Sequence, residues 1–417
     1  MRRRGIATQQ LNGCVAEPLA PNFKLKYEGK YQFWPIPQTE TDRYAPALKQ
    51  NPDYCSAATL HCLYDKHEEV CMISKEKCRM PELIFGTSGL GNLYEAWPSE
   101  TKWRIVEECV RMAPGPLVFD TAGKYGAGLA LETLGEGLRK QDVRPGEVVI
   151  SNKLGWYRTA LKGKEPSFEP GVWKDLQHDA VQRISYDGIM ACYEQGNALL
   201  NGYRAGWVSV HDPDEYLAAA VSPADRKQRF EDVLSAYVAL KDLQREGSVT
   251  GVGIGSKDWT VVRAICEVVE MDWVMIANSF TMHHHPAELV AFMRQLDAQG
   301  IPIVNAAVFN GGFLTGQDFY NYRGVSPHTH PELYRWREKM HTVCREFGIL
   351  PAAACVAFAK SAPGVRSIAL NMTADYRAAS QVDILKTSIP AAFWERMAAE
   401  NLIDEHFAET HLYAPDI

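Results

Sequence analysis

Acid–base side chains follow three apolar runs of the chain. Asp120 and Tyr125 stand in "FDTAGKYG" after the run "GPLVF", Lys153 lies in "VISNKLGW", and His211 lies in "VSVHDPD". A lone buried ammonium is unfavourable without an acid partner, so we expect Lys153 to pair with Asp120 of the neighbouring run. A cation about 4 Å away lowers the pKa of a tyrosine, ordinarily about 10, by up to roughly three units. These four titratable residues therefore predict one polar site at the strand ends.

Each of these residues also has a structural explanation. Asp120 could cap a turn, Tyr125 and His211 could belong to the core, and Lys153 could be a solvated strand end. Lys153 could instead be the nucleophile of a Schiff-base barrel enzyme. A shared site is favoured over the structural explanations, because Lys153 follows an apolar strand and a buried ammonium needs an acid partner. The glycines on both sides of Tyr125 allow the tight loop that such a site needs at a strand end.

The elements that must position these residues alternate between apolar, β-rich runs and amphipathic helical stretches, which is typical of parallel sheets. The eight expected strands are 83–89, 117–123, 147–155, 206–212, 249–255, 272–280, 301–309 and 365–371. Helix ends are marked by Pro98 and Ser99 before one helix and by Gly247 and Gly300 after two others. We predict a single (β/α)8 TIM barrel, in which the strand ends bring the four residues together. A doubly wound open sheet is the alternative, but "GTSGLGNLY" does not have its GxGxxG spacing.

Two segments of different character make up the chain. Residues 1–80 are irregular, proline-containing and partly helical, so we interpret them as an N-terminal extension, whereas 81–417 form the barrel with a C-terminal helix. The extension holds Cys55, Cys62, Cys71 and Cys78. They are interpreted as free thiols on helix faces, as a twin-cysteine hairpin with two disulfides, or as a metal site assisted by His61 and His67. Free thiols are favoured, because metal sites use more closely spaced cysteine pairs.

Composition indicates small-molecule chemistry. Apolar residues make up 46% and charged residues 23% of the chain, and the formal net charge is -7. A nucleic-acid or anionic-membrane partner would need a basic face, so neither is expected. No apolar stretch approaches the roughly 20 residues of a membrane span, and the start "MRRRGIATQQLNGC" has no apolar segment for export. Together with the scattered cysteines, these features favour the cytoplasm.

The three motifs resemble the catalytic tetrad of the aldo-keto reductases. "FDTAGKYG", "SNKLG" and "VHDPD" follow one another on successive strands, and the resemblance runs from about residue 82 to about residue 382. It implies that Tyr125 is the general acid/base, that Lys153 and Asp120 tune it, and that His211 orients the substrate oxygen. It also implies hydride transfer to or from a nicotinamide cofactor that lies across the barrel mouth.

The resemblance implies a set of cofactor-binding positions. They are Gly86, Thr87, Gly255, Ser256, Asn278, Phe309, Gly311, Asn371, Thr373, Arg377 and Gln381. Arg377 stands where the family often grips a 2′-phosphate, but Asn371 stands where a lysine often assists, so both NADP and NAD remain candidates. Ala306 replaces the tyrosine that commonly stacks on the nicotinamide, and Phe309 is expected to fill that space. Glu132 stands one residue after the usual position of a glutamate.

Further motifs are similar to one branch of the family, which contains D-threo-aldose (L-fucose) 1-dehydrogenases, L-galactose dehydrogenase and pyridoxal dehydrogenase. They are "GLGNLY", "YDGIM", "HDPDEY" and "VNAAVFNGGFL". This similarity implies hydride transfer at C1 of an aldose, or of a related aldehyde or ketone. The substrate side is expected to include Trp156, Asp212, Phe309, Asn92 and Trp97.

Other interpretations stay open. The chain could be a non-catalytic, cofactor-binding regulatory subunit, and a homo-oligomer is possible. His283 to His285, His328 and His330 form two histidine groups, but consecutive side chains diverge, so no metal site is expected.

Overall fold

The computed structural model describes residues 80–413. The expectations for the cysteines of the N-terminal extension, and for nearly all of that extension, lie outside the described residues.

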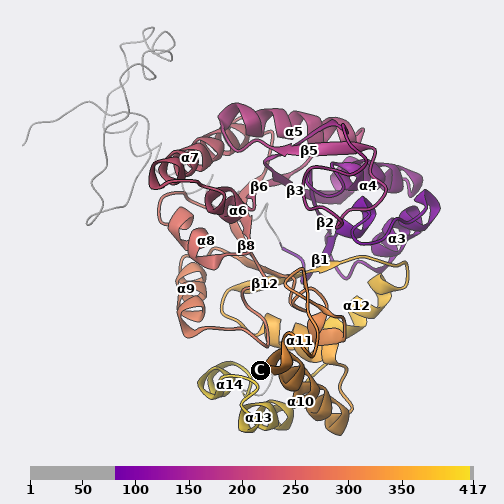
Figure 1. Cartoon of the computed structure of the whole chain (residues 1–417). Coiled ribbons are helices and arrows are strands. Elements are labelled where there is room, and N and C mark those ends of the chain that lie inside the picture. Colours follow the sequence, from indigo (N-terminus) through magenta and orange to yellow (C-terminus); the bar gives the residue numbers. More distant parts are fainter. Residues whose placement is uncertain (1–79, 414–417) are drawn as a thin grey trace, which may run out of the picture.

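Eight parallel strands close into a barrel that is surrounded by helices (Figure 1). They are β1 (Leu83–Gly86), β2 (Leu117–Ala122), β3 (Val148–Leu154), β6 (Trp207–His211), β7 (Gly251–Ser256), β8 (Trp273–Ala277), β9 (Ile303–Ala306) and β12 (Val365–Asn371). Neighbours in sequence pair in order around the ring, and β1 closes it by pairing with both β2 and β12. The predicted fold class and all eight predicted strands are confirmed.

The interior of the barrel is packed with side chains from the strands. This cluster includes Ile84, Val118, Trp207, Trp273, Met275 and Val304, all buried. The rings of Trp207 and Trp273 lie 6.3 Å apart, and Gly253 provides the space for Trp273, because a Cβ at Gly253 would overlap the indole. The interior of the barrel is therefore filled with side chains, and a functional site is expected at an end of the barrel.

Helices cover the outside of the barrel. The main ones are α3 (Ser99–Met112), α4 (Leu129–Lys140), α5 (Tyr186–Leu200), α7 (Pro223–Arg245), α8 (Trp259–Cys266), α9 (Ala287–Ala298), α11 (Pro351–Lys360) and α12 (Arg377–Leu385). The predicted ends are confirmed: α3 begins at Ser99 after Pro98, while Gly247 and Gly300 follow α7 and α9 with φ of 75° and 70°. These glycines adopt the left-handed conformation that ends many helices.

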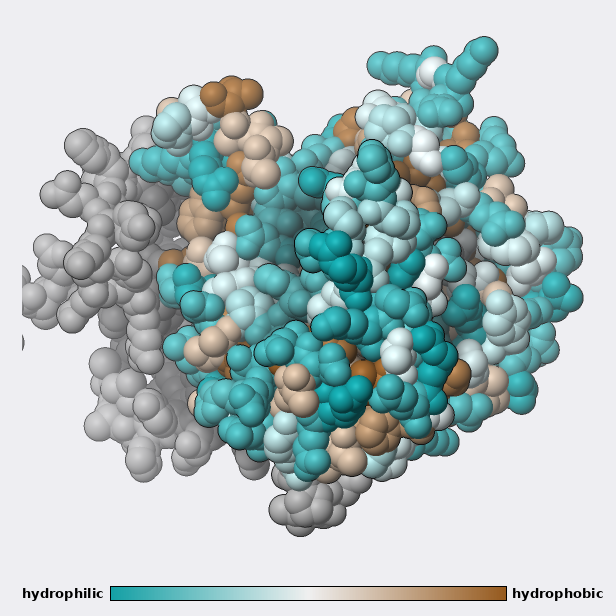
Figure 2. Space-filling model, turned by 60° about the horizontal axis from the view of Figure 1, so that its bottom comes forward, coloured by the Kyte–Doolittle hydropathy of each residue, from teal (hydrophilic) through white to brown (hydrophobic). Residues whose placement is uncertain are grey.

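Three further helices form an outer group beside α11 (Figure 1). They are α10 (Pro331–Phe347), α13 (Ala391–Ala399) and α14 (Glu405–His411). Figure 2 turns the lower part of Figure 1 toward the viewer, and on this face hydrophobic residues are scattered among hydrophilic ones. Between residues 80 and 413 no single helix is long and apolar enough to cross a membrane; only α10 and α11 together, bent by 99°, reach that length and composition.

The sequence analysis missed two small hairpins. β4 (Trp156–Ala160) pairs antiparallel with β5 (His178–Gln182) in the connection between β3 and α5, and β10 (Phe319–Tyr320) pairs with β11 (Arg323–Gly324) after β9. A 3₁₀ turn, Ser88–Gly91, follows β1, and a short helix, α6 (Pro213–Ala218), follows β6. The two hairpins, the 3₁₀ turn and α6 all lie in connections that follow the C-terminal ends of barrel strands, namely β1, β3, β6 and β9.

Replacement of Gly253 by alanine should destabilise the barrel. The new methyl group would overlap the Trp273 ring in a packed interior, so the free energy of unfolding should fall by about 1–3 kcal/mol. Gly115→Ala is the matched control, because a methyl group added there would meet no atom of a non-adjacent residue within 4 Å. Chemical denaturation measures both variants, and equal stabilities would contradict this account of the interior.

Candidate active site

The structure brings the four predicted catalytic residues together at the C-terminal ends of the strands. The Lys153 ammonium donates a hydrogen bond to Oδ2 of Asp120, and both side chains are buried. The same ammonium lies 4.8 Å from the centre of the Tyr125 ring. The ring of His211 stands perpendicular to that of Tyr125, with 5.7 Å between the ring centres. The predicted pairing of Lys153 with Asp120 is confirmed.

Close backbone packing fixes the loop that carries Tyr125. Gly126 has a φ of 62°, and a Cβ there would overlap the carbonyl oxygen of Gly91 in the first loop. A Cβ on Gly91 would likewise meet the backbone of Tyr125 at 2.7 Å. The two loops therefore need glycine at their contact, which explains the glycine that follows the tyrosine.

Hydrogen bonds of Arg158 support the other side of this loop. Arg158 of β4 forms two parallel hydrogen bonds of 2.7 and 2.8 Å with the Glu132 carboxylate of α4. Its Nε also donates to the Ala127 carbonyl at 2.6 Å. Glu132 therefore stabilises the Tyr125 loop through Arg158, a role that its sequence position alone does not reveal.

The electrostatic setting of Tyr125 differs from the sequence-based expectation. Burial raises the pKa of the phenol well above its ordinary value, and Asp120, Tyr322 and Asp212 raise it further, while Lys124 lowers it. The expectation that the pKa of Tyr125 is lowered is therefore wrong for this structure. Lys153 lies over the ring and hydrogen-bonds to Asp120, so desolvation of the hydroxyl dominates. Tyr125 is a protonated phenol at neutral pH.

His211 is held as a neutral imidazole. Burial lowers its pKa well below the ordinary value, and although Asp212 acts in the opposite direction, Lys153, Lys124 and Lys257 lower the pKa further. Its Nδ1 is buried without a hydrogen-bond partner among the described residues, and its Nε2 lies 3.5 Å from Oδ2 of Asp212. A neutral ring of this kind can donate one hydrogen bond to a substrate oxygen.

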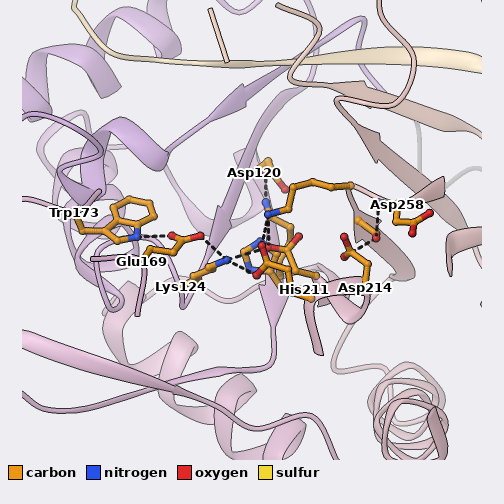
Figure 3. A network of polar contacts seen from close by, with 12 residues as sticks. Asp120, Lys124, Glu169, Trp173, His211, Asp214 and Asp258 are labelled. Carbon is orange, nitrogen blue, oxygen red and sulfur yellow. Dashed lines mark hydrogen bonds and ion pairs between the residues drawn. The ribbon is translucent and has the colours of Figure 1, made fainter. Parts of the chain in front are cut away.

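A cluster of charges beside His211 was missed by the sequence analysis (Figure 3). Lys124, next to Tyr125 in the chain, has a side chain only 3% exposed, and its Nζ lies 2.8 Å from Glu169, 3.2 Å from Asp212 and 2.8 Å from Glu215. Lys257 after β7 also pairs with Asp212 and Glu215. We call these five residues the ionic cluster. Lys124 itself was visible in "FDTAGKYG", but its carboxylate partners come from distant segments.

The ionic cluster keeps its members charged despite burial. Burial opposes the charge of Lys124, but Asp212 and Glu169 raise its pKa above the ordinary value. Burial also opposes the charge of Asp212, whereas the ammonium groups of Lys257 and Lys124 lower its pKa below the ordinary value. Asp212 is therefore an ionised carboxylate next to His211.

The predicted cofactor-binding residues surround the same end of the barrel. Gly86 and Thr87 end β1, Gly255 and Ser256 end β7, Asn278 follows β8, Phe309 and Gly311 follow β9, and Asn371, Thr373, Arg377 and Gln381 belong to β12, the next loop and α12. Two hydrogen bonds hold Asn371: its Oδ1 accepts from the Gly89 amide of the first loop at 3.2 Å, and its carbonyl accepts from Gln381 Nε2 at 3.1 Å.

Two of these residues present unused acceptors that fit a dinucleotide. The side-chain oxygens of Asn278 and Gln381 are buried without a hydrogen-bond donor among the described residues. A nicotinamide carboxamide and an adenine amino group both carry N–H donors, which is the kind of group that these two acceptors lack. Arg377 is exposed at the start of α12, where its guanidinium is accessible to a phosphate.

The predicted substrate residues separate into two groups. Asp212 belongs to the ionic cluster, and the ring of Trp156 lies 5.1 Å from the Lys124 ammonium. Asn92 is buried and donates to the Lys174 carbonyl, while Trp97 is half-buried in the loop between β1 and α3. Phe309 packs against the hydrophobic core. Asp212 contacts His211 directly, and Trp156 lies beside Lys124, the residue before Tyr125.

Two aromatic residues near Tyr125 were not predicted. The ring of Trp173 lies 5.9 Å from that of Tyr125, and its Nε1 donates to Glu169 at 2.7 Å. Tyr322, in the turn between β10 and β11, has a φ of 67°, and its ring lies 5.6 Å from the Lys257 ammonium. Both come from loops whose positions depend on tertiary packing.

The strand order and the site define a closed parallel barrel with an aspartate–lysine pair, a tyrosine and a histidine at its C-terminal end. The sequence profile of the Aldo/keto reductase family matches residues 82–401, and the chain belongs to this family of oxidoreductases. The resemblance stated from the sequence motifs is confirmed.

Known relatives and structures agree with this assignment. Pyridoxal 4-dehydrogenase of Microbacterium luteolum is 26% identical over 77% of this chain and 94% of its own. D-threo-aldose 1-dehydrogenase of Pseudomonas sp is 26% identical over 78% of this chain and 95% of its own. The holo form of aldo-keto reductase AKR11C1 from Bacillus halodurans has the same fold, with a TM-score of 0.55, 19% identity, and coverage of 78% of this chain and 95% of that one.

Removal of one member of the buried ion pair should destabilise the protein strongly. Lys153→Met leaves the Asp120 carboxylate buried without its cation, so the free energy of unfolding should fall by about 3–5 kcal/mol. The double variant Asp120→Asn with Lys153→Met removes both charges and should recover much of the loss. Denaturant titration measures these values.

The control for this comparison is Lys227→Met, whose ion pair with Glu231 is exposed. That variant should change the stability by less than about 1 kcal/mol. If Lys153→Met is no less stable than this control, the side chains do not form a desolvated pair.

Proposed function

We propose that this protein is an NAD(P)-dependent oxidoreductase that transfers hydride between a nicotinamide cofactor and C1 of an aldose, or a related aldehyde or ketone. Tyr125 is the general acid/base, Asp120 and Lys153 hold the charge beside it, and His211 orients the substrate oxygen. The observation that carries the proposal is the gathering of these side chains at one end of the barrel, with the Lys153 ammonium over the Tyr125 ring and His211 perpendicular to it.

Residues of this chain donate and accept the proton that is transferred to or from the substrate oxygen. The nicotinamide, when bound, supplies or accepts the hydride at the carbonyl carbon. In reduction, Tyr125 donates its hydroxyl proton to the carbonyl oxygen as that oxygen gains negative charge, and an alcohol results. In oxidation, the Tyr125 phenolate takes the hydroxyl proton back, and the C=O bond forms. Neutral His211 donates a hydrogen bond to the same oxygen in both directions.

Cofactor binding is assigned to the residues around the ends of β1, β7, β8 and β12. The unpaired acceptors of Asn278 and Gln381 support a dinucleotide that spans the barrel mouth. Arg377 favours binding of the 2′-phosphate of NADP, whereas Asn371, which stands where a lysine often assists in the family, favours NAD. The assay must therefore include both cofactors. The five described cysteines are all free thiols, in keeping with a cytoplasmic enzyme that acts on a small carbonyl compound or sugar.

Two relatives support the substrate class. One is named for pyridoxal and the other for D-threo-aldoses, both of which are small, oxygen-rich carbonyl compounds. The ionic cluster beside His211 offers polar groups to such a substrate rather than an apolar wall.

The decisive experiment follows nicotinamide absorbance with NAD, NADP and their reduced forms against a panel of aldoses and aldehydes. Wild-type protein should turn over at least one substrate, and Tyr125→Phe should lower kcat by about 10²- to 10⁴-fold, because the proton donor is lost. Full activity of Tyr125→Phe would disprove the assigned role.

Two other outcomes favour other functions. Cofactor binding without turnover by the wild-type protein would favour a regulatory subunit. Covalent trapping of substrate on Lys153 by borohydride, without a nicotinamide, would favour a Schiff-base enzyme.

The pH dependence should reflect the raised pKa of Tyr125. Since burial holds the phenol in its protonated form, kcat/KM for reduction should stay level across the neutral range and decline only at strongly alkaline pH. The rate of oxidation should rise with pH over the same range, because that direction needs the phenolate. Initial rates in buffers of constant ionic strength, with deuterated cofactor to show that hydride transfer limits the rate, check this. An alkaline limb near neutral pH for reduction would contradict the direction of the pKa shift.

A further inference from the structure

The ionic cluster joins five loops or strand ends around the catalytic residues. Lys124 comes from the loop after β2, Glu169 from the connection of β4 and β5, Asp212 from the end of β6, Glu215 from α6, and Lys257 from the loop after β7. The acid–base step needs none of these charges. Their burial beside His211 therefore calls for another explanation.

Asp212 stands at the centre of the ionic cluster. Its Oδ2 lies 3.2 Å from Lys124, 3.4 Å from Lys257 and 3.5 Å from Nε2 of His211. The residue is 6% exposed, and the contacts of its carboxylate with Lys124, Lys257 and His211 are all made by Oδ2 rather than by the other oxygen, Oδ1. A carboxylate has acceptor capacity on both oxygens, so a buried ionised carboxylate beside the catalytic histidine keeps one oxygen available.

The backbone of Asp212 is also held in an unusual conformation. Its φ is 49°, in the left-handed region that a residue with a side chain seldom adopts, and its amide donates to the Gly255 carbonyl at 3.1 Å. Asp212 directly follows His211 and stands at the start of α6. Its side chain is held by the ammonium groups of Lys124 and Lys257. Strain of this kind persists where surrounding contacts determine the geometry.

The chemistry of such a carboxylate matches a hydroxyl donor. The ionic cluster contains two ammonium groups and three carboxylates, so it carries one net negative charge. The lysines therefore do not cancel all of the negative charge around Asp212. In the proposed function His211 donates a hydrogen bond to the reacting oxygen, and Oδ2 of Asp212 lies 3.5 Å from Nε2 of His211. An oxygen on the carbon next to the reacting carbon would therefore fall near Asp212.

We propose that Asp212 is a specificity residue that accepts a hydrogen bond from a hydroxyl on the carbon adjacent to the reacting carbonyl carbon, and that Lys124 and Lys257 are positioning residues that hold it there. This inference rests on the proposed function and narrows its substrate class to 2-hydroxycarbonyl compounds. A site built to bind a hydroxyl discriminates strongly against an analogue that lacks it, because the buried acceptor is then left unpaired.

The test compares glycolaldehyde with propanal, which have equal numbers of heavy atoms and differ by a hydroxyl in place of a methyl group. The measurement is the ratio of their kcat/KM values in reduction by the wild-type protein. The ratio should favour glycolaldehyde by at least about tenfold. A ratio near unity with active enzyme overturns the inference but leaves the proposed function intact, whereas no turnover of any substrate overturns both.

Variants then assign the preference to Asp212. Asp212→Asn should lower the glycolaldehyde-to-propanal ratio by about 10- to 100-fold, whatever its effect on either rate alone. The matched control is Asp225→Asn, an aspartate that is ion-paired to Arg229 at the start of α7, and it should keep the wild-type ratio. An unchanged ratio in folded Asp212→Asn overturns the assignment.

Lys124 provides a second and independent measurement. Lys124→Met removes one cation that holds Asp212 and should lower the ratio by about 3- to 10-fold, while Lys124→Arg should retain most of it, because the charge is kept. A purely structural role would lower both rates together and leave the ratio unchanged, which would overturn the positioning role. These variants and the wild-type ratio decide the inference even if Asp212→Asn does not fold.

Discussion

The buried ion pair between Lys153 and Asp120 is the constraint on which the site depends. Both side chains come from adjacent parallel strands, and each is excluded from water. Neither charge would be stable there alone, so each side chain depends on the other once β2 and β3 have paired. Tyr125 then takes its place over the ammonium, and the loop that carries it is confined by the first loop on one side and by Arg158 on the other.

Around this pair lies another set of opposite charges that has a different purpose. The Lys153–Asp120 pair belongs to the strands, whereas the ionic cluster ties loops together and includes residues with partly exposed side chains, such as Glu169 and Glu215. Asp212 links the ionic cluster to His211, because its Oδ2 lies near both His211 and Lys124. The same protein thus uses ion pairs both between neighbouring strands of the barrel and among the loops at the end of those strands.

Much of the fold could be predicted from the sequence, because barrel strands that are buried on both faces appear as apolar runs with turn residues at their ends. The tetrad was also predictable, since Asp120, Lys153 and His211 occupy equivalent positions on three such runs. The ionic cluster was not, because Lys124 finds its partners in loops that are distant in sequence. The half-exposed strands β4 and β5 lack a continuous apolar pattern. The raised pKa of Tyr125 depends on desolvation, which arises only when the loops pack.

The pairing of β1 with β12, which closes the barrel, has a consequence for folding during synthesis. β1 pairs with β12, and the Gly89 amide after β1 bonds to Asn371, which is separated from it by 282 positions. The ribosome releases the first strand long before the last, so the edge of β1 has to wait, unpaired on one side, until nearly the whole chain has been synthesised. Asp120, Tyr125, Lys153 and His211 all emerge before the final strand, yet one of the hydrogen bonds that hold the first loop beside Tyr125 can form only when that strand arrives.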